Sequence, residues 1–135
     1  MARDEAYRKA EQRIEKARQE GATELDLSYM GLTEVPEAIA SLTQLQMLNL
    51  SRNQLRELPE AIGSLTQLQT LEIQNARLTS LPESLCQLTH LKKLFLNGNQ
   101  LQTLPLWLRQ LSNLEAIYLD AQIHEIPQWI RSEEH

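Results

Sequence analysis

Five prolines divide this chain into segments of almost equal length, and this regularity constrains the fold more than any other feature. Successive prolines are 23, 23, 23 and 22 residues apart, and the chain contains no others: Pro36, Pro59, Pro82, Pro105 and Pro127. Positions at fixed distances from these prolines are aliphatic in nearly every segment. A repeat of this length indicates one structural unit copied along the chain, with neighbouring units stacked to bury a continuous core.

The spacing inside one unit predicts its local structure. In Leu48-Asn49-Leu50 and its equivalents leucine alternates with another residue, which indicates a short strand with the leucines pointing inward. No hairpin partner lies within the unit, so each strand is expected to pair with its copy in the next unit, in a parallel sheet. Proline is expected at the first position of a helical turn on the return limb. Five units follow, at about 19–41, 42–64, 65–87, 88–110 and 111–132.

The shared pattern is L-x-x-L-x-x-L-x-L-x-x-N-x-L-x-x-L-P-x-x-I-x-x. It resembles the leucine-rich repeat family, specifically the 23-residue class found in bacterial cytoplasmic proteins, Roco-type GTPases and Ras-group-related proteins. The resemblance implies an α/β fold: a right-handed solenoid of five repeats with a concave parallel sheet. It also implies that the sheet binds a protein.

The sequence departs from the family at the asparagine that caps backbone amides of neighbouring turns. Asn53 and Asn99 match this asparagine, whereas Met30 and Ala76 replace it. The fifth repeat offers only Ala121 or Gln122. We therefore expect a broken asparagine ladder and a looser turn at residues 75–77.

Residues 1–21 lie before the repeats and are predicted to form a capping helix. Tyr7, Ala10, Ile14 and Ala17 fall on one narrow helical stripe, and Gly21 stands where a helix C-cap belongs. Residues 1–20 contain six Lys or Arg and five Asp or Glu, so the helix lacks the positive excess of a membrane-binding or calmodulin-binding helix. It is expected to cover the exposed leucines of the first repeat.

The C-terminal end carries apolar side chains at positions that are small or charged in earlier repeats. Leu106 replaces a glutamate, and Trp107 and Trp129 replace small residues. Either the tryptophans fold over the open edge as a substitute cap, or the three residues form a surface for self-association or domain docking. Residues 133–135 are expected to be a polar tail.

The outward strand positions define the predicted binding face. Phe95, the only phenylalanine in the chain, is expected to touch Tyr118 on the next strand and to anchor a partner. The alternative is an aromatic pair that only stabilises adjacent strands. The predicted footprint comprises Phe95, Tyr118, Lys93, Asn97, Glu72, Asn49, Asp26 and Arg52. Its acidic N-terminal part favours a basic segment on the partner.

Several function classes are disfavoured. The net charge of −5 argues against a nucleic-acid partner, and no apolar run approaches the ~20 residues of a membrane span. The three histidines and single cysteine have no metal-binding spacing, and no phosphate-binding glycine motif is present. Asp26 and Glu72 are not expected on adjacent strands, which argues against a two-carboxylate hydrolase. We therefore expect no cofactor and no enzymatic activity. The single Cys86 and the charged N-terminus fit a cytoplasmic location.

Two functions from different classes remain. The first is a non-catalytic module that binds a partner protein, of unidentified kind, on the concave sheet. The second is a structural unit that forms a homodimer through Leu106, Trp107 and Trp129 at the C-terminal edge. The chain is also compatible with being the leucine-rich part of a larger signalling protein.

Overall fold

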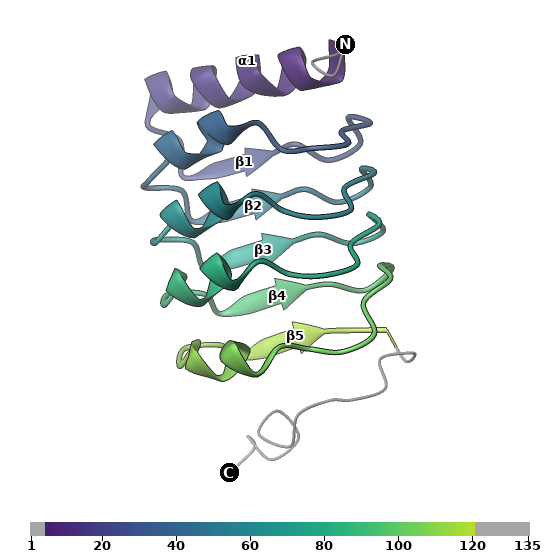
Figure 1. The fold of residues 1–135 in the computed structure, drawn as a ribbon. Coiled ribbons are helices and arrows are strands. Elements are labelled where there is room, and N and C mark those ends of the chain that lie inside the picture. Colours follow the sequence, from purple (N-terminus) through teal and green to yellow (C-terminus); the bar gives the residue numbers. More distant parts are fainter. Residues whose placement is uncertain (1–4, 121–135) are drawn as a thin grey trace.

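The computed structural model describes residues 5–120, which form one helix followed by four stacked coils and the strand that begins a fifth (Figure 1). Each coil contributes one strand to a single parallel sheet with the order β1-β2-β3-β4-β5. The strands are Glu24–Asp26 (β1), Met47–Asn49 (β2), Thr70–Glu72 (β3), Lys93–Phe95 (β4) and Ala116–Tyr118 (β5). The predicted pairing of each strand with its copy in the next repeat is confirmed.

Helix α1 (Glu5–Glu20) covers the first coil, as Figure 1 shows at the N-terminal end of the stack. The predicted stripe of Tyr7, Ala10, Ile14 and Ala17 is the buried side of this helix. Gly21 has a φ of +63° and ends the helix, and the Ala22 amide donates to the Ala17 carbonyl at 3.0 Å. This is the left-handed C-cap expected of glycine, and it directs the chain into β1.

A five-residue 3-10 helix lies on the return limb of each of the first four coils. These turns are Glu37–Ser41 (η1), Glu60–Ser64 (η2), Glu83–Gln87 (η3) and Leu106–Gln110 (η4). The preceding proline is the N-cap rather than the first helical residue: Pro36 has a ψ of 140°, and its carbonyl accepts from the Ile39 amide at 3.1 Å. The expectation for proline was wrong by one position. Proline is still suited to this N-cap position, because it has no backbone N–H that would need a hydrogen-bond acceptor.

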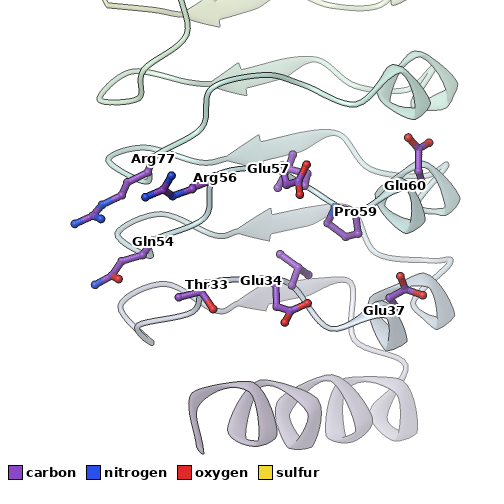
Figure 2. A pocket seen from close by; sticks show the side chains of 11 residues that line it. Thr33, Glu34, Glu37, Gln54, Arg56, Glu57, Pro59, Glu60 and Arg77 are labelled. Atoms are coloured by element: carbon purple, nitrogen blue, oxygen red, sulfur yellow. The ribbon is translucent and has the colours of Figure 1, made fainter. Parts of the chain in front are cut away.

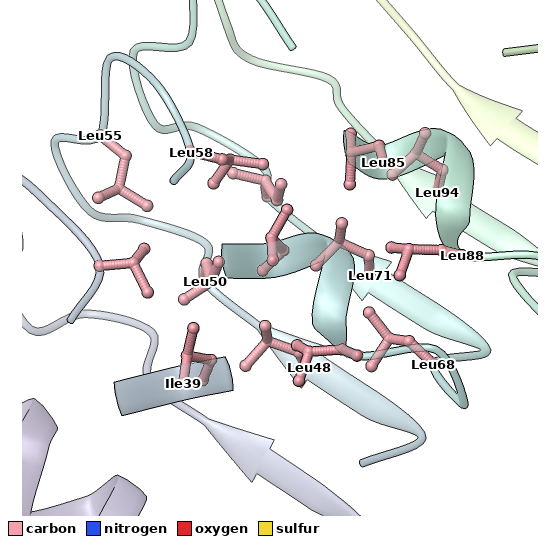
Figure 3. Packing of buried hydrophobic residues seen from close by; sticks show 14 of the residues in the cluster. Ile39, Leu48, Leu50, Leu55, Leu58, Leu68, Leu71, Leu85, Leu88 and Leu94 are labelled. Atoms are coloured by element: carbon pink, nitrogen blue, oxygen red, sulfur yellow. The ribbon is translucent and has the colours of Figure 1, made fainter. Parts of the chain in front are cut away.

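The core lies between the strands and the 3-10 turns and consists almost entirely of leucine and isoleucine (Figure 3). Leu48, Leu71 and Leu94 occupy the same position in successive strands and are fully buried. The equivalent residue of β5, Ile117, is only partly buried. Stacking therefore buries each strand leucine between its copies.

Candidate binding face

The outward side chains of the five strands form the concave face of the sheet. The register pairs Asp26, Asn49, Glu72, Phe95 and Tyr118 as successive partners along one column. A second column contains Glu24, Met47, Thr70, Lys93 and Ala116. The first column contains Phe95 and Tyr118 and the second contains Lys93, all of which belong to the predicted footprint.

Phe95 and Tyr118 stack face to face on β4 and β5. Their ring centroids are 4.3 Å apart and the ring planes differ by 6°. Phe95 is half-buried, and Tyr118 is 45% exposed. The predicted ring contact is confirmed. It follows from the separation of about 4.8 Å between neighbouring strands, which brings equivalent side chains to stacking distance.

Three other residues of the predicted footprint lie close to this aromatic pair along the strands. Lys93 is exposed on the same strand as Phe95, and Glu72 is the register partner of Phe95 on β3. Asn97 follows β4, and its Oδ1 atom is buried without a hydrogen-bond partner among the described residues. The structure therefore groups Glu72, Lys93 and Asn97 with the two rings.

Asp26 and Asn49 have acceptor atoms that are already engaged within their own turns. Asp26 Oδ1 accepts from the Ser28 hydroxyl at 2.5 Å and from the Ser28 amide at 2.8 Å. These two hydrogen bonds hold the pKa of the Asp26 carboxyl below its ordinary value, with a smaller contribution from the Arg13 charge. Asn49 Oδ1 accepts from the Ser51 amide at 2.9 Å. Both side chains thus stabilise the turn that leaves their strand.

Arg52 lies in the turn after β2, away from the aromatic pair. Its guanidinium carbon is 5.8 Å from the centre of the Tyr29 ring, and Tyr29 is 75% exposed. Both residues have a positive φ, 58° for Tyr29 and 62° for Arg52. Arg52 and Tyr29 therefore form a separate cation–π pair at the edge of the first two repeats.

The C-terminal apolar residues differ in their surroundings. Leu106 begins η4 and is 65% exposed. Trp107 is partly buried and packs against the leucine core. Trp129 lies outside the described residues, so its relation to the other two stays a prediction.

The sequence analysis did not predict an open hollow on the surface of the segments that lead from the strands to the 3-10 turns (Figure 2). It has a volume of about 640 Å³ and is lined by side chains of the first three repeats, including Arg56 and Arg77. One sequence feature could have indicated this surface: at a single repeat position the residue changes from Gly31 and Gln54 to a charged Arg77.

Two classes of site are missing from the described part of the chain. Residues 5–120 contain no cluster of three or more His, Cys, Asp or Glu that would hold a metal ion. Across the same residues, no helix has the length and apolar character needed to cross a membrane.

Comparison with known proteins agrees with this architecture. The family model described as "Leucine-rich repeat region" matches residues 24–132. A solved structure titled "Structure of Shigella effector LRR domain" is similar, with a TM-score of 0.74 and 26% sequence identity over 91% of this chain. The match covers 51% of that chain, so this protein spans about half the length of the effector domain. No curated protein sequence matches. The five-strand stack and the family match together establish that this chain belongs to the leucine-rich repeat family, a general class of protein-interaction module.

Proposed function

We propose that this chain binds a partner protein on its concave face, with Phe95 and Tyr118 as the anchor. The observation that carries the proposal is the stacked pair itself: two large rings, one of them 45% exposed, on a sheet surface that is otherwise mostly polar. Large aromatic side chains at the centre of a contact commonly supply much of its binding energy. Stacking also fixes both rings before binding, so little side-chain entropy is lost on association.

The charges around the anchor favour a partner with apolar and basic groups. Glu24, Asp26 and Glu72 make the side of the face that precedes β4 acidic, whereas Lys93 is the only basic residue in the strand columns. An apolar group of the partner would pack on the exposed ring of Tyr118. A basic segment of the partner would extend toward β1 along the acidic side chains.

Site-specific photo-crosslinking tests this proposal. A photoreactive phenylalanine analogue at position 118 is expected to capture a partner in native lysate, and the same analogue at Glu83, on the return limb, is expected not to capture it. The captured protein is then tested for binding to purified variants. Phe95→Ala is expected to weaken binding through the loss of the aromatic anchor, and Glu72→Lys through repulsion of the partner's basic segment. Glu83→Ala serves as the matched control. Equal binding by all three variants, with unchanged thermal unfolding, would contradict the proposal.

Leu106 supports a second candidate, a homodimer through the C-terminal edge. Its 65% exposure is unusual for leucine in a protein whose other leucines are mainly buried. Sedimentation of the wild type and of Leu106→Glu tests this candidate. A dimer that the substitution converts to a monomer supports it, and a wild type that sediments as a monomer excludes it.

We propose a reducing compartment, the cytoplasm, as the location. The only cysteine, Cys86, is half-buried and free, which fits a compartment where thiols stay reduced. A role as the leucine-rich part of a larger signalling protein also fits the match to the effector domain, because this chain covers only 51% of that chain.

A further inference from the structure

Two open hollows meet at Arg56 and Arg77 on the flank of the first three repeats. The larger, of about 640 Å³, extends from these arginines along the return limb to η1 and η2. The smaller, of about 260 Å³, is lined by Arg56, Arg77, Thr79 and Gln100. The two arginines therefore border both hollows.

The smaller hollow contains only side chains that can donate hydrogen bonds. No carboxylate lines it. Arg56 and Arg77 are both exposed, and neither forms an ion pair within residues 5–120. Two unpaired guanidiniums that border the same hollow repel each other, and an anionic group between them would remove that repulsion. The planar guanidinium is especially suited to the two oxygens of a carboxylate.

The larger hollow separates opposite charges along its length. Figure 2 shows Arg56, Arg77 and Gln54 on one side of the view and Glu37 and Glu60 on the other, with Glu57 between them. Glu34 also lines this hollow. A polyanion that followed the hollow would meet these four carboxylates. The charge distribution instead complements a ligand that is acidic at one end and basic at the other.

We propose that this flank docks an extended segment of a partner protein. An acidic side chain of the segment lies between Arg56 and Arg77, and a basic side chain of the same segment lies against Glu37, Glu57 and Glu60. Val35, Leu58 and Pro59 provide the apolar part of the lining, against which the segment's backbone packs. This surface lies apart from Phe95 and Tyr118, so it operates whether or not the concave face binds a partner.

The test uses synthetic peptides and the full chain. The first probe is acetyl-Glu-Glu-Gly-Ser-Gly-Lys-Lys-amide, and the second replaces both lysines by glutamate. A third probe has glutamine at all four charged positions, and the fourth is inorganic phosphate. Binding is followed by NMR through the side-chain Nε–Hε signals of Arg56 and Arg77. The mixed-charge peptide is expected to shift both signals to saturation and to bind more tightly than the other three probes.

Matched variants assign the binding to this site. Arg56→Gln with Arg77→Gln is expected to weaken binding of the mixed-charge peptide by about tenfold or more, because charge-assisted hydrogen bonds are lost. Arg109→Gln, an exposed arginine outside both hollows, is expected to leave it unchanged. These side chains are exposed, and thermal unfolding of each variant checks that the fold is retained.

Three results would overturn the proposal. Phosphate that shifts the arginine signals as strongly as the peptide would indicate a simple anion site. The all-acidic peptide binding more tightly than the mixed-charge one would remove the role of the glutamates. Unaltered binding by the double variant would place the contact elsewhere. None of these results bears on the concave face, whose test uses residues 95 and 118.

Discussion

The side chain of Asn53 joins the turns of the first two repeats. Its Oδ1 atom accepts from the backbone amides of Met30 and Leu32, each at 3.0 Å. Its Nδ2 atom donates to the carbonyl oxygens of Leu27 and Leu50, at 2.9 Å and 3.0 Å. Asn53 is 4% exposed, so water cannot easily take over these bonds. One amide therefore satisfies four backbone groups at the edge of the core.

We predict that Asn53→Ala lowers the free energy of unfolding by about 2–4 kcal/mol, because buried backbone donors and acceptors would lose their partners. Urea denaturation measures this change. The control lies one repeat later, where Ala76 holds the same position and is buried. Ala76→Asn is expected to raise stability by about 1 kcal/mol, since its amide would face the backbone amides of residues 53 and 55. A loss below about 1 kcal/mol for Asn53→Ala would contradict the structural role given to this side chain.

The repeat predicted most of the fold because its period fixes both stacking and strand register. Once Leu94 and Leu96 point inward, Phe95 must point outward beside Tyr118, and the ring contact follows from strand spacing alone. The stripe of Tyr7, Ala10, Ile14 and Ala17 was predicted separately, from the spacing of apolar residues along a helix. Features that follow from a regular spacing of residues could therefore be predicted from the sequence.

Features that depend on the hydrogen-bond partners of a single side chain could not be predicted from the sequence. The Asp120 carboxylate accepts from the Gly98 amide at 2.7 and 2.8 Å. In the preceding repeat the equivalent amide, that of Asn75, donates to a backbone carbonyl, that of Asn97. A periodic pattern does not indicate such an exchange, nor that Asp26 caps its own turn. The two hollows bordered by Arg56 and Arg77 were not predicted for a related reason, because their shape depends on where long arginine side chains extend.

One turn position has a positive φ in four successive repeats, and its residues differ. The values are 58° for Tyr29, 62° for Arg52, 57° for Asn75 and 83° for Gly98. We predict that Gly98→Ala lowers stability by at least about 1–2 kcal/mol, because the left-handed conformation is strained for alanine. In addition, the new Cβ would collide with the side chain and backbone of Asn75.

Arg52→Gly is the matched control at this position. It relieves the same backbone strain, and we expect its stability to equal that of the wild type or exceed it by up to about 1 kcal/mol. Thermal unfolding of the two variants measures the contrast. If both substitutions changed stability in the same direction and by the same amount, the left-handed position would not be the cause.

The capping helix offers a third prediction. Ile14 is 1% exposed and belongs to the continuous core. Ile14→Ala is expected to cost about 2–4 kcal/mol, from lost burial and the cavity that remains. Because each coil contacts only its neighbours, hydrogen exchange should accelerate most at β1 and least at β4. Glu11→Ala on the exposed side of the helix is the control, and uniform acceleration across the sheet would contradict a local capping role.

The Asp26 carboxyl makes stability depend on pH in a predictable direction. Its pKa in the folded chain is lowered by the hydroxyl and the amide of Ser28. A group whose folded pKa lies below its unfolded value stabilises the fold above the unfolded value, here 3.8, and loses that contribution as the pH falls through the folded pKa. We predict that Asp26→Asn is less stable than the wild type at neutral pH and that the difference shrinks below about pH 4.

Urea denaturation of both chains between neutral and acidic pH measures this difference, and a carboxyl NMR titration of Asp26 measures the pKa itself. Ser28→Ala removes the strongest interaction, so the pKa of Asp26 should rise toward its ordinary value in that variant. An unaltered pKa in Ser28→Ala, or a stability difference that stays constant down to acidic pH, would show that the hydroxyl does not hold this carboxylate in its charged form.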